Sequence, residues 1–149
     1  MRELEEELET AHEMQMRLMP KEEPEIEGIE LSGRCLSANH VGGDFFQYFV
    51  RGGKPSVCLA DVTGHAMEAA VPVMMFSGVL RDELQYGHSL EKLYSNLTRI
   101  LYDMLDLRTF VCFSMGEVEI PPARSNGDPP VALPFRLANG GVPIPFTTG

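Results

Sequence analysis

The sequence predicts an α+β domain with a largely antiparallel sheet, and three observations lead to this fold class. Residues 44–50 and 56–62 have the composition of strands and are joined by a Gly-Gly turn of the hairpin type. Two long helical patterns then follow one another without a strand between them, which is typical of α+β proteins. The sequence contains no glycine-rich strand-turn-helix fingerprint, which argues against a Rossmann fold.

Residues 1–19 are expected to form one helix. A heptad rhythm of alternating steps of four and three is formed by Leu4, Leu8, Ala11, Gln15 and Leu18. Pro20 ends the pattern, so we assign residues 1–20 as an amphipathic linker helix and residues 21–149 as the domain. Two interpretations stay open. The helix is either solvated and packed on its own domain, or it ends a coiled-coil linker from an upstream sensor domain and forms a homodimer through its leucine stripe.

Five segments have the alternation or the apolar runs of strands. They are residues 28–38, 44–50, 56–62, 109–119 and 135–139. The segment 56–62 is short and apolar on both faces, so we expect it to be buried. Residues 121–134 are rich in Pro, Gly, Asn and Ser and show no periodicity, which predicts a mobile loop.

Two helices are expected in the middle of the chain. From Gly64 to Gln85, apolar residues recur at steps of three and four, although Pro72 is unfavourable inside a helix. Gly87 ends this helix, and Ser89 is expected to cap the next one. The second helix presents an apolar face that runs from Leu90 to Met104.

Composition limits the partners and the compartment. The chain of 149 residues has a net charge of -10, which argues against binding to nucleic acid or anionic lipid through bulk electrostatics. No stretch reaches the ~18 apolar residues of a membrane span, and the acidic N-terminus is not a signal peptide. Cys35, Cys58 and Cys112 fit neither a zinc site nor a disulfide framework. We expect them to be reduced core residues of a cytoplasmic protein.

Two aspartates at strand ends are the candidate metal-binding and catalytic residues. Asp44 follows Gly42-Gly43, and Asp61 ends an apolar run shortly before Gly64. Mg²⁺ and Mn²⁺ prefer oxygen ligands, so we expect both carboxylates to converge on one acidic site. Asp44 alone also fits a turn residue that accepts backbone hydrogen bonds.

Asp61 has a different alternative role. We expect its carboxylate to be buried at the end of an apolar strand, where an unpaired charge costs several kcal/mol. It could instead cap the helix that follows, but Thr63 is better placed to do so. His65 could be a ligand or an acid, but an isolated histidine is more often a surface or supporting residue, and Glu68 is expected to be solvated. No Ser-His-Asp order and no convincing Cys-His pair occur in the sequence.

Five ordered motifs complete the pattern. They are Ala11-x-x-Met-Gln-x-x-Leu-Met-Pro20, Ala38-x-x-Val-Gly-Gly-Asp-Phe-Phe46, Ala60-Asp-Val-Thr-Gly-His-Ala-Met-x-Ala-Ala70, Thr109-Phe-Val111 and Leu137-Ala-Asn-Gly-Gly141. In this order, and over nearly the whole chain, they resemble the bacterial sporulation stage II E-like serine phosphatases. These belong to the metal-dependent, PPM-type protein phosphatases.

The resemblance implies an antiparallel β-sandwich of two sheets with paired flanking helices, and a two-metal centre that usually holds Mn²⁺ or Mg²⁺. Asp61 would bridge both ions, Val62 would coordinate through its carbonyl, and Asp44 would be a further ligand, partly through water. The implied reaction is the hydrolysis of phosphoserine by metal-activated water. The implied substrate is a phosphorylated regulatory protein of the anti-sigma-factor antagonist type.

The chain also departs from the pattern it resembles. Ala66 stands where the relatives usually have glycine, which we interpret as a tolerable change at a helix start, and Val142 stands where many have histidine. The family continues for several strands, with a later metal-binding aspartate in a Thr-Asp-Gly context. The chain is therefore expected to lack the C-terminal strands and to have little phosphatase activity by itself. The alternative is a non-catalytic interaction or dimerisation module with an incomplete metal site.

Overall fold

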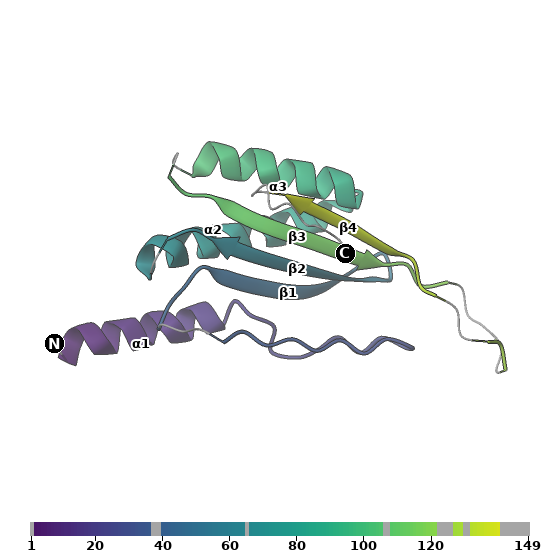
Figure 1. The fold of residues 1–149 in the computed structure, drawn as a ribbon, viewed down its shortest axis with the longest axis horizontal. Helices are drawn as coiled ribbons and strands as arrows, with labels where there is room; N and C mark the ends of the chain where they lie inside the picture. Colours follow the sequence, from purple (N-terminus) through teal and green to yellow (C-terminus); the bar gives the residue numbers. More distant parts are fainter. Residues whose placement is uncertain are drawn as a thin grey trace, which may run out of the picture.

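The computed structural model describes residues 2–36, 40–64, 66–105, 108–121, 127–129 and 132–140 (Figure 1). Within these residues the chain forms, in order, helix α1 (Arg2–Met16), strands β1 (Asp44–Arg51) and β2 (Lys54–Val62), helix α2 (Met67–Glu83), the short 3₁₀ helix η1 (Leu84–Tyr86), helix α3 (Leu90–Met104), and strands β3 (Val111–Val118) and β4 (Phe135–Gly140). The predicted α+β class is confirmed. The predicted division into residues 1–20 and 21–149 stays a prediction.

The four strands form one antiparallel sheet in the order β1-β2-β3-β4. Gly52 and Gly53 turn the chain between β1 and β2 with positive φ angles of 53° and 77°, a conformation that glycine adopts at low cost. Helices α2 and α3 cover one face of the sheet, and the end of α1 lies near the beginning of β1 (Figure 1). The second sheet of a sandwich is not seen among the described residues, so the sandwich stays a prediction.

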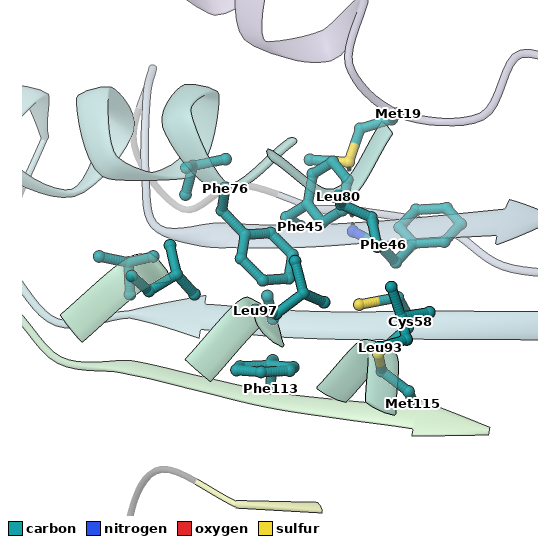
Figure 2. Close-up of a cluster of buried hydrophobic side chains, with 14 of the residues drawn as sticks. Met19, Phe45, Phe46, Cys58, Phe76, Leu80, Leu93, Leu97, Phe113 and Met115 are labelled. Carbon is teal, nitrogen blue, oxygen red and sulfur yellow. Dashed lines mark hydrogen bonds between the residues drawn. The ribbon is translucent and has the colours of Figure 1, made fainter. Parts of the chain in front are cut away.

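The core fills the space between the sheet and the two helices (Figure 2). Its centre is a run of aromatic rings in which Phe76 of α2 lies 5.6 Å from Phe45 and 5.3 Å from Phe113, measured between ring centroids. Leu93 and Leu97 of α3 are also fully buried. The apolar faces predicted for the two helices are therefore the faces that bind them to the sheet.

The strand predicted over residues 28–38 is wrong for its described part, residues 28–36, which pair only through an isolated bridge between Ile26 and Ile29. Gly28 has a positive φ of 83°, and the Ile29 N–H donates to the Ile26 carbonyl over 3.1 Å, so this segment closes a tight turn. The outer edge of β1 is also engaged, because the Phe46 N–H points to the Met19 sulfur. Residues 37–39 lie outside the described part.

The apolar sequence of β2 predicted burial on both faces, but only one face of the strand is buried. Cys58, Ala60 and Val62 are buried, whereas Leu59 is 56 % exposed and Asp61 is exposed. The reason is that, among the described elements, α2 and α3 cover only the face that carries Cys58 and Ala60. The burial of β2 therefore alternates with the period of two expected of a sheet with one covered face.

The remaining elements follow the sequence closely. The predicted N-terminal helix is present as α1, and the strands predicted at 44–50, 109–119 and 135–139 are β1, β3 and β4. The Ser89 hydroxyl accepts a hydrogen bond from the Lys92 N–H over 3.2 Å, so the predicted cap of α3 is confirmed. The predicted loop 121–134 has neither helix nor strand where it is described, but residues 122–126, 130 and 131 lie outside that part. No helix among the described residues has the length and apolar character that crossing a membrane requires.

Candidate functional site

The two aspartates singled out in the sequence lie directly opposite one another. Asp44 is the first residue of β1, Asp61 is next to last in β2, and the antiparallel register pairs them. Paired residues point to the same face of a sheet, with Cβ atoms roughly 5 Å apart. The expected convergence is therefore found, whereas binding of a metal by these residues stays a prediction.

The carboxylate of Asp61 is exposed, which corrects the expectation that it is buried. Although it is exposed, Asp61 loses part of its hydration, and this desolvation raises its pKa. The negative charge of Asp44 and a hydrogen bond between the two carboxyl groups raise the pKa of Asp61 further. Two carboxylates at this separation repel when both are ionised. A shared proton or a bound cation relieves that repulsion, so the pair has the electrostatics of a cation site.

Gly43 brings the end of β2 close to the segment that leads into Asp44. A Cβ atom on Gly43 would collide with the carbonyl oxygen of Val62 and would lie 3.1 Å from the side chain of Ala69 in α2. The Val62 N–H donates to the Gly43 carbonyl over 2.9 Å. Only glycine therefore permits this approach between the Val62 carbonyl and the residue that precedes Asp44.

The connection from β2 to α2 is built differently from the sequence prediction. Thr63 does not cap α2, because its hydroxyl accepts from the Phe110 N–H and its own N–H donates to the Phe110 carbonyl, each over 3.0 Å. Both bonds tie the end of β2 to the chain entering β3. The N-cap of α2 is Ala66, without a side-chain cap. His65 lies outside the described residues.

Ala66 has a φ of 49° and a ψ of -122°, which is a strained conformation for a residue with a Cβ atom. The position before α2 thus has a backbone conformation that glycine adopts at lower cost than alanine. We expected alanine to be tolerated here as a residue inside the start of a helix. That expectation is wrong, because Ala66 precedes the first residue of α2 and has a strained backbone.

Asp44 and Asp61 line a cavity of about 450 Å³. Its other polar and charged lining residues are Arg34, from the chain before β1, and Ser114 of β3. Cys112, which pairs with Asp61 in the β2–β3 register, lies in the same lining. Arg34 was not singled out in the sequence, because it stands alone in an irregular segment and no motif carries it. The cavity thus combines two carboxylates with one guanidinium.

The donor set fits a hard divalent cation in part. Two carboxylates and a backbone carbonyl are all oxygen donors, the type that Mg²⁺ and Mn²⁺ prefer. Among the described residues there is no group of three or more His, Cys, Asp or Glu side chains that could hold an ion. Asp44, Asp61 and the Val62 carbonyl would therefore leave about half of the positions of an octahedral ion to water or to further donors.

Comparisons with known proteins place this site in context. Residues 51–146 match the family described as Stage II sporulation protein E (SpoIIE). The chain is also similar to the phosphoserine phosphatase RsbU of Bacillus subtilis (strain 168), with 22% identity over 109 residues. That alignment covers 73% of this chain and 32% of the relative, so the chain spans about a third of that protein's length. The family match includes Asp61 and Val62, whereas Asp44 lies just before it.

Proposed function

Because the chain belongs to the Stage II sporulation protein E family, we propose that it forms part of a metal-dependent serine/threonine protein phosphatase. The observation that carries this proposal is the direct pairing of Asp44 with Asp61 at one end of the sheet. The similarity to a phosphoserine phosphatase supports the same reaction class. The PPM-type sandwich and the two-metal centre are part of the proposal.

In this proposal Asp44, Asp61 and the carbonyl of Val62 hold Mn²⁺ or Mg²⁺. When bound, such ions generate a nucleophile from water at neutral pH and offset the charge of the phosphoryl oxygens. Asp61, paired with Asp44 on one side and Cys112 on the other, is held by the ladders of both neighbouring strands. Its backbone is therefore held from both sides, whereas that of Asp44, among the described strands, is paired on one side only.

Arg34 has a separate role in the proposed reaction. Arg34 lines the same cavity as Asp44 and Asp61, and guanidinium groups bind phosphate oxygens through paired hydrogen bonds. A phosphoserine that enters the cavity would be held by Arg34 on one side. Its phosphorus would then face the water that the acidic pair holds in place.

The substrate and the partners belong to the same proposal. We place the substrate among phosphorylated regulatory proteins of the anti-sigma-factor antagonist type, with an upstream sensor domain that controls the enzyme. Helix α1 would connect the two and form a homodimer. Leu4, in the leucine stripe of α1, is 61% exposed, which leaves it accessible to a second helix.

The test is a titration of the 149-residue chain with Mn²⁺, followed by calorimetry, together with hydrolysis of p-nitrophenyl phosphate and of a phosphoserine peptide. We expect wild-type chain to bind Mn²⁺, and Asp61→Asn and Asp44→Asn to bind it much more weakly. Equal binding by wild type and both variants would refute the metal site and the phosphatase with it.

The alternative function is a non-catalytic interaction or dimerisation module. The observation that favours it is the small donor set among the described residues, which holds an ion through only two side chains. Such a module would dimerise through α1 and show neither Mn²⁺ binding nor hydrolysis. The Mn²⁺ titration separates the two functions, because dimerisation through α1 is expected of both.

A further inference from the structure

Helix α1 is attached to the segment that leads into Asp44 through a buried glutamine. Gln15 is only 2% exposed, although it is polar and lies near the end of a helix that is otherwise largely exposed. Its side-chain amide donates to the Gly42 carbonyl over 2.5 Å, and its carbonyl oxygen accepts from the Gly42 N–H over 3.0 Å. Both ends of the side chain are therefore bonded to one residue.

The Gln15 side chain gives Gly42 the hydrogen bonds that a neighbouring strand would otherwise supply. Gly42 lies before the first residue of β1, so the ladder with β2 does not reach it. A buried peptide group without a partner is costly, and a glutamine side chain, with one donor and one acceptor end, can bond both groups of a peptide residue. One helical turn earlier, the His12 ring nitrogen Nδ1 contacts the His40 carbonyl. Helix α1 thus holds the same segment at two places.

The segment is held from the other side as well. Gly43, the next residue, accepts a hydrogen bond from the Val62 N–H and fits closely against the Val62 carbonyl. The two residues before Asp44 are therefore fixed between α1 and the end of β2. A change at Gln15 moves the point from which Asp44 enters the sheet, without touching the carboxylate itself.

We propose that Gln15 is a positioning residue for Asp44, which sets the carboxylate opposite Asp61 in the geometry that binds a divalent cation. The inference rests on the proposed metal site and adds to it a dependence on α1. Outer partners of metal ligands are typically worth about 10- to 100-fold in metal affinity. Glutamine has both the donor for the Gly42 carbonyl and the acceptor for the Gly42 N–H. Leucine offers no hydrogen bonds, and an ionised glutamate would place a negative charge against the Gly42 carbonyl.

The chain supplies a matched control in Gln47. Its side-chain amide donates to the Leu18 carbonyl over 3.1 Å, so it also connects β1 to the chain at the end of α1. Its other end accepts from the neighbouring Tyr48 N–H, and neither bond involves the residues before Asp44. Gln47→Leu therefore removes a link between the same two parts of the fold and leaves the Gly42 contact in place.

The experiment compares Mn²⁺ affinity, melting temperature and hydrogen exchange of the Gly42 amide in wild type, Gln15→Leu, Gln15→Glu and Gln47→Leu. We expect both Gln15 variants to bind Mn²⁺ about tenfold more weakly or worse. Gln15→Leu, which has no acceptor for the Gly42 N–H, should also lose protection of the Gly42 amide. Gln47→Leu should change the melting temperature only. The exchange measurement does not depend on bound metal, so it reports the Gln15 contact by itself.

Each outcome decides between the alternatives. If wild type binds Mn²⁺ and the Gln15 variants bind it equally well, Gln15 does not position Asp44, while the proposed function stands. If wild type binds no Mn²⁺, the proposed function fails, and the inference fails with it. If both Gln15 variants unfold while Gln47→Leu folds, Gln15 serves stability and the positioning role is overturned.

Discussion

Gly43 offers the sharpest test of how the site is built, since its neighbour Gly42 has open space where Gly43 lies against the Val62 carbonyl. A Cβ atom on Gly43 would collide with the backbone carbonyl of Val62, whereas a Cβ atom on Gly42 would meet nothing within 4 Å. Gly42 is not among the glycines with positive φ either. We therefore predict that Gly43→Ala destabilises the protein and that Gly42→Ala does not.

The magnitude follows from three contributions. Forcing an atom into a filled space costs about 1–3 kcal/mol, and displacing the Val62 N–H from the Gly43 carbonyl costs about 1 kcal/mol. Replacing glycine by alanine restricts the unfolded chain and returns about 0.4–1 kcal/mol. The net destabilisation of Gly43→Ala is about 2 kcal/mol. Gly42→Ala retains only the last contribution and should be neutral or stabilised by up to about 1 kcal/mol.

The assay is urea denaturation followed by circular dichroism, with the melting temperature as a second measure. For a domain of this size, about 2 kcal/mol corresponds to a decrease of roughly 4–8 °C in the melting temperature. Gly43→Ala should also weaken Mn²⁺ binding, because the Val62 carbonyl has to move. Equal free energies of unfolding for the two alanine variants would show that the close approach between Gly43 and Val62 is not a real constraint.

Three further predictions concern the same region and the core. The pKa of Asp61 is raised by partial desolvation and then by the charge of Asp44. Asp61→Asn removes the ionised form that both effects disfavour, so it should leave the metal-free protein as stable as wild type or more so. It should also abolish the rise in melting temperature that Mn²⁺ gives wild type; a Mn²⁺-dependent rise of wild-type size in this variant would contradict the site. Ala66→Gly should stabilise the protein by about 1 kcal/mol, since it relieves a φ of 49°, and an unchanged denaturation midpoint would argue against strain there. Burial raises the pKa of the Cys58 thiol from 9.0 to about 12. Iodoacetamide at pH 8 should therefore modify Cys58 only after unfolding, and stability should be unaffected by this thiol below pH 9 and decrease as the pH rises toward 12; rapid labelling of the native protein, mapped by mass spectrometry, would contradict this.

Much of the sheet could be predicted because its signals are local. The Gly-Gly pair at residues 52 and 53 and the aromatic run in 44–50 predict the hairpin, and the hairpin determines the register. Once that register is fixed, Asp44 and Asp61 have to meet, since each stands at the same distance from the turn. The convergence of the candidate site was therefore accessible from the sequence, without knowledge of any tertiary contact.

The errors come from contacts between distant segments. Residues 28–36 alternate like a strand, but Gly28 closes a turn and the outer edge of β1 is engaged by Met19. The apolar run of β2 gave no indication that one of its faces would be open. Burial depends on which elements cover a strand, and the composition of that strand alone does not determine it.

Gln15 shows how a correct pattern can hide a different physical cause. It occupies a position in the heptad rhythm of α1, and the rhythm correctly places it on the buried face. The rhythm explains burial through hydrophobic contact, however, and Gln15 is buried because both ends of its amide bond the Gly42 peptide. A polar residue at an apolar position costs stability unless such partners exist. Its presence in the stripe was thus a signal that the helix holds a specific backbone segment, and the segment it holds is the one that delivers Asp44 to the site.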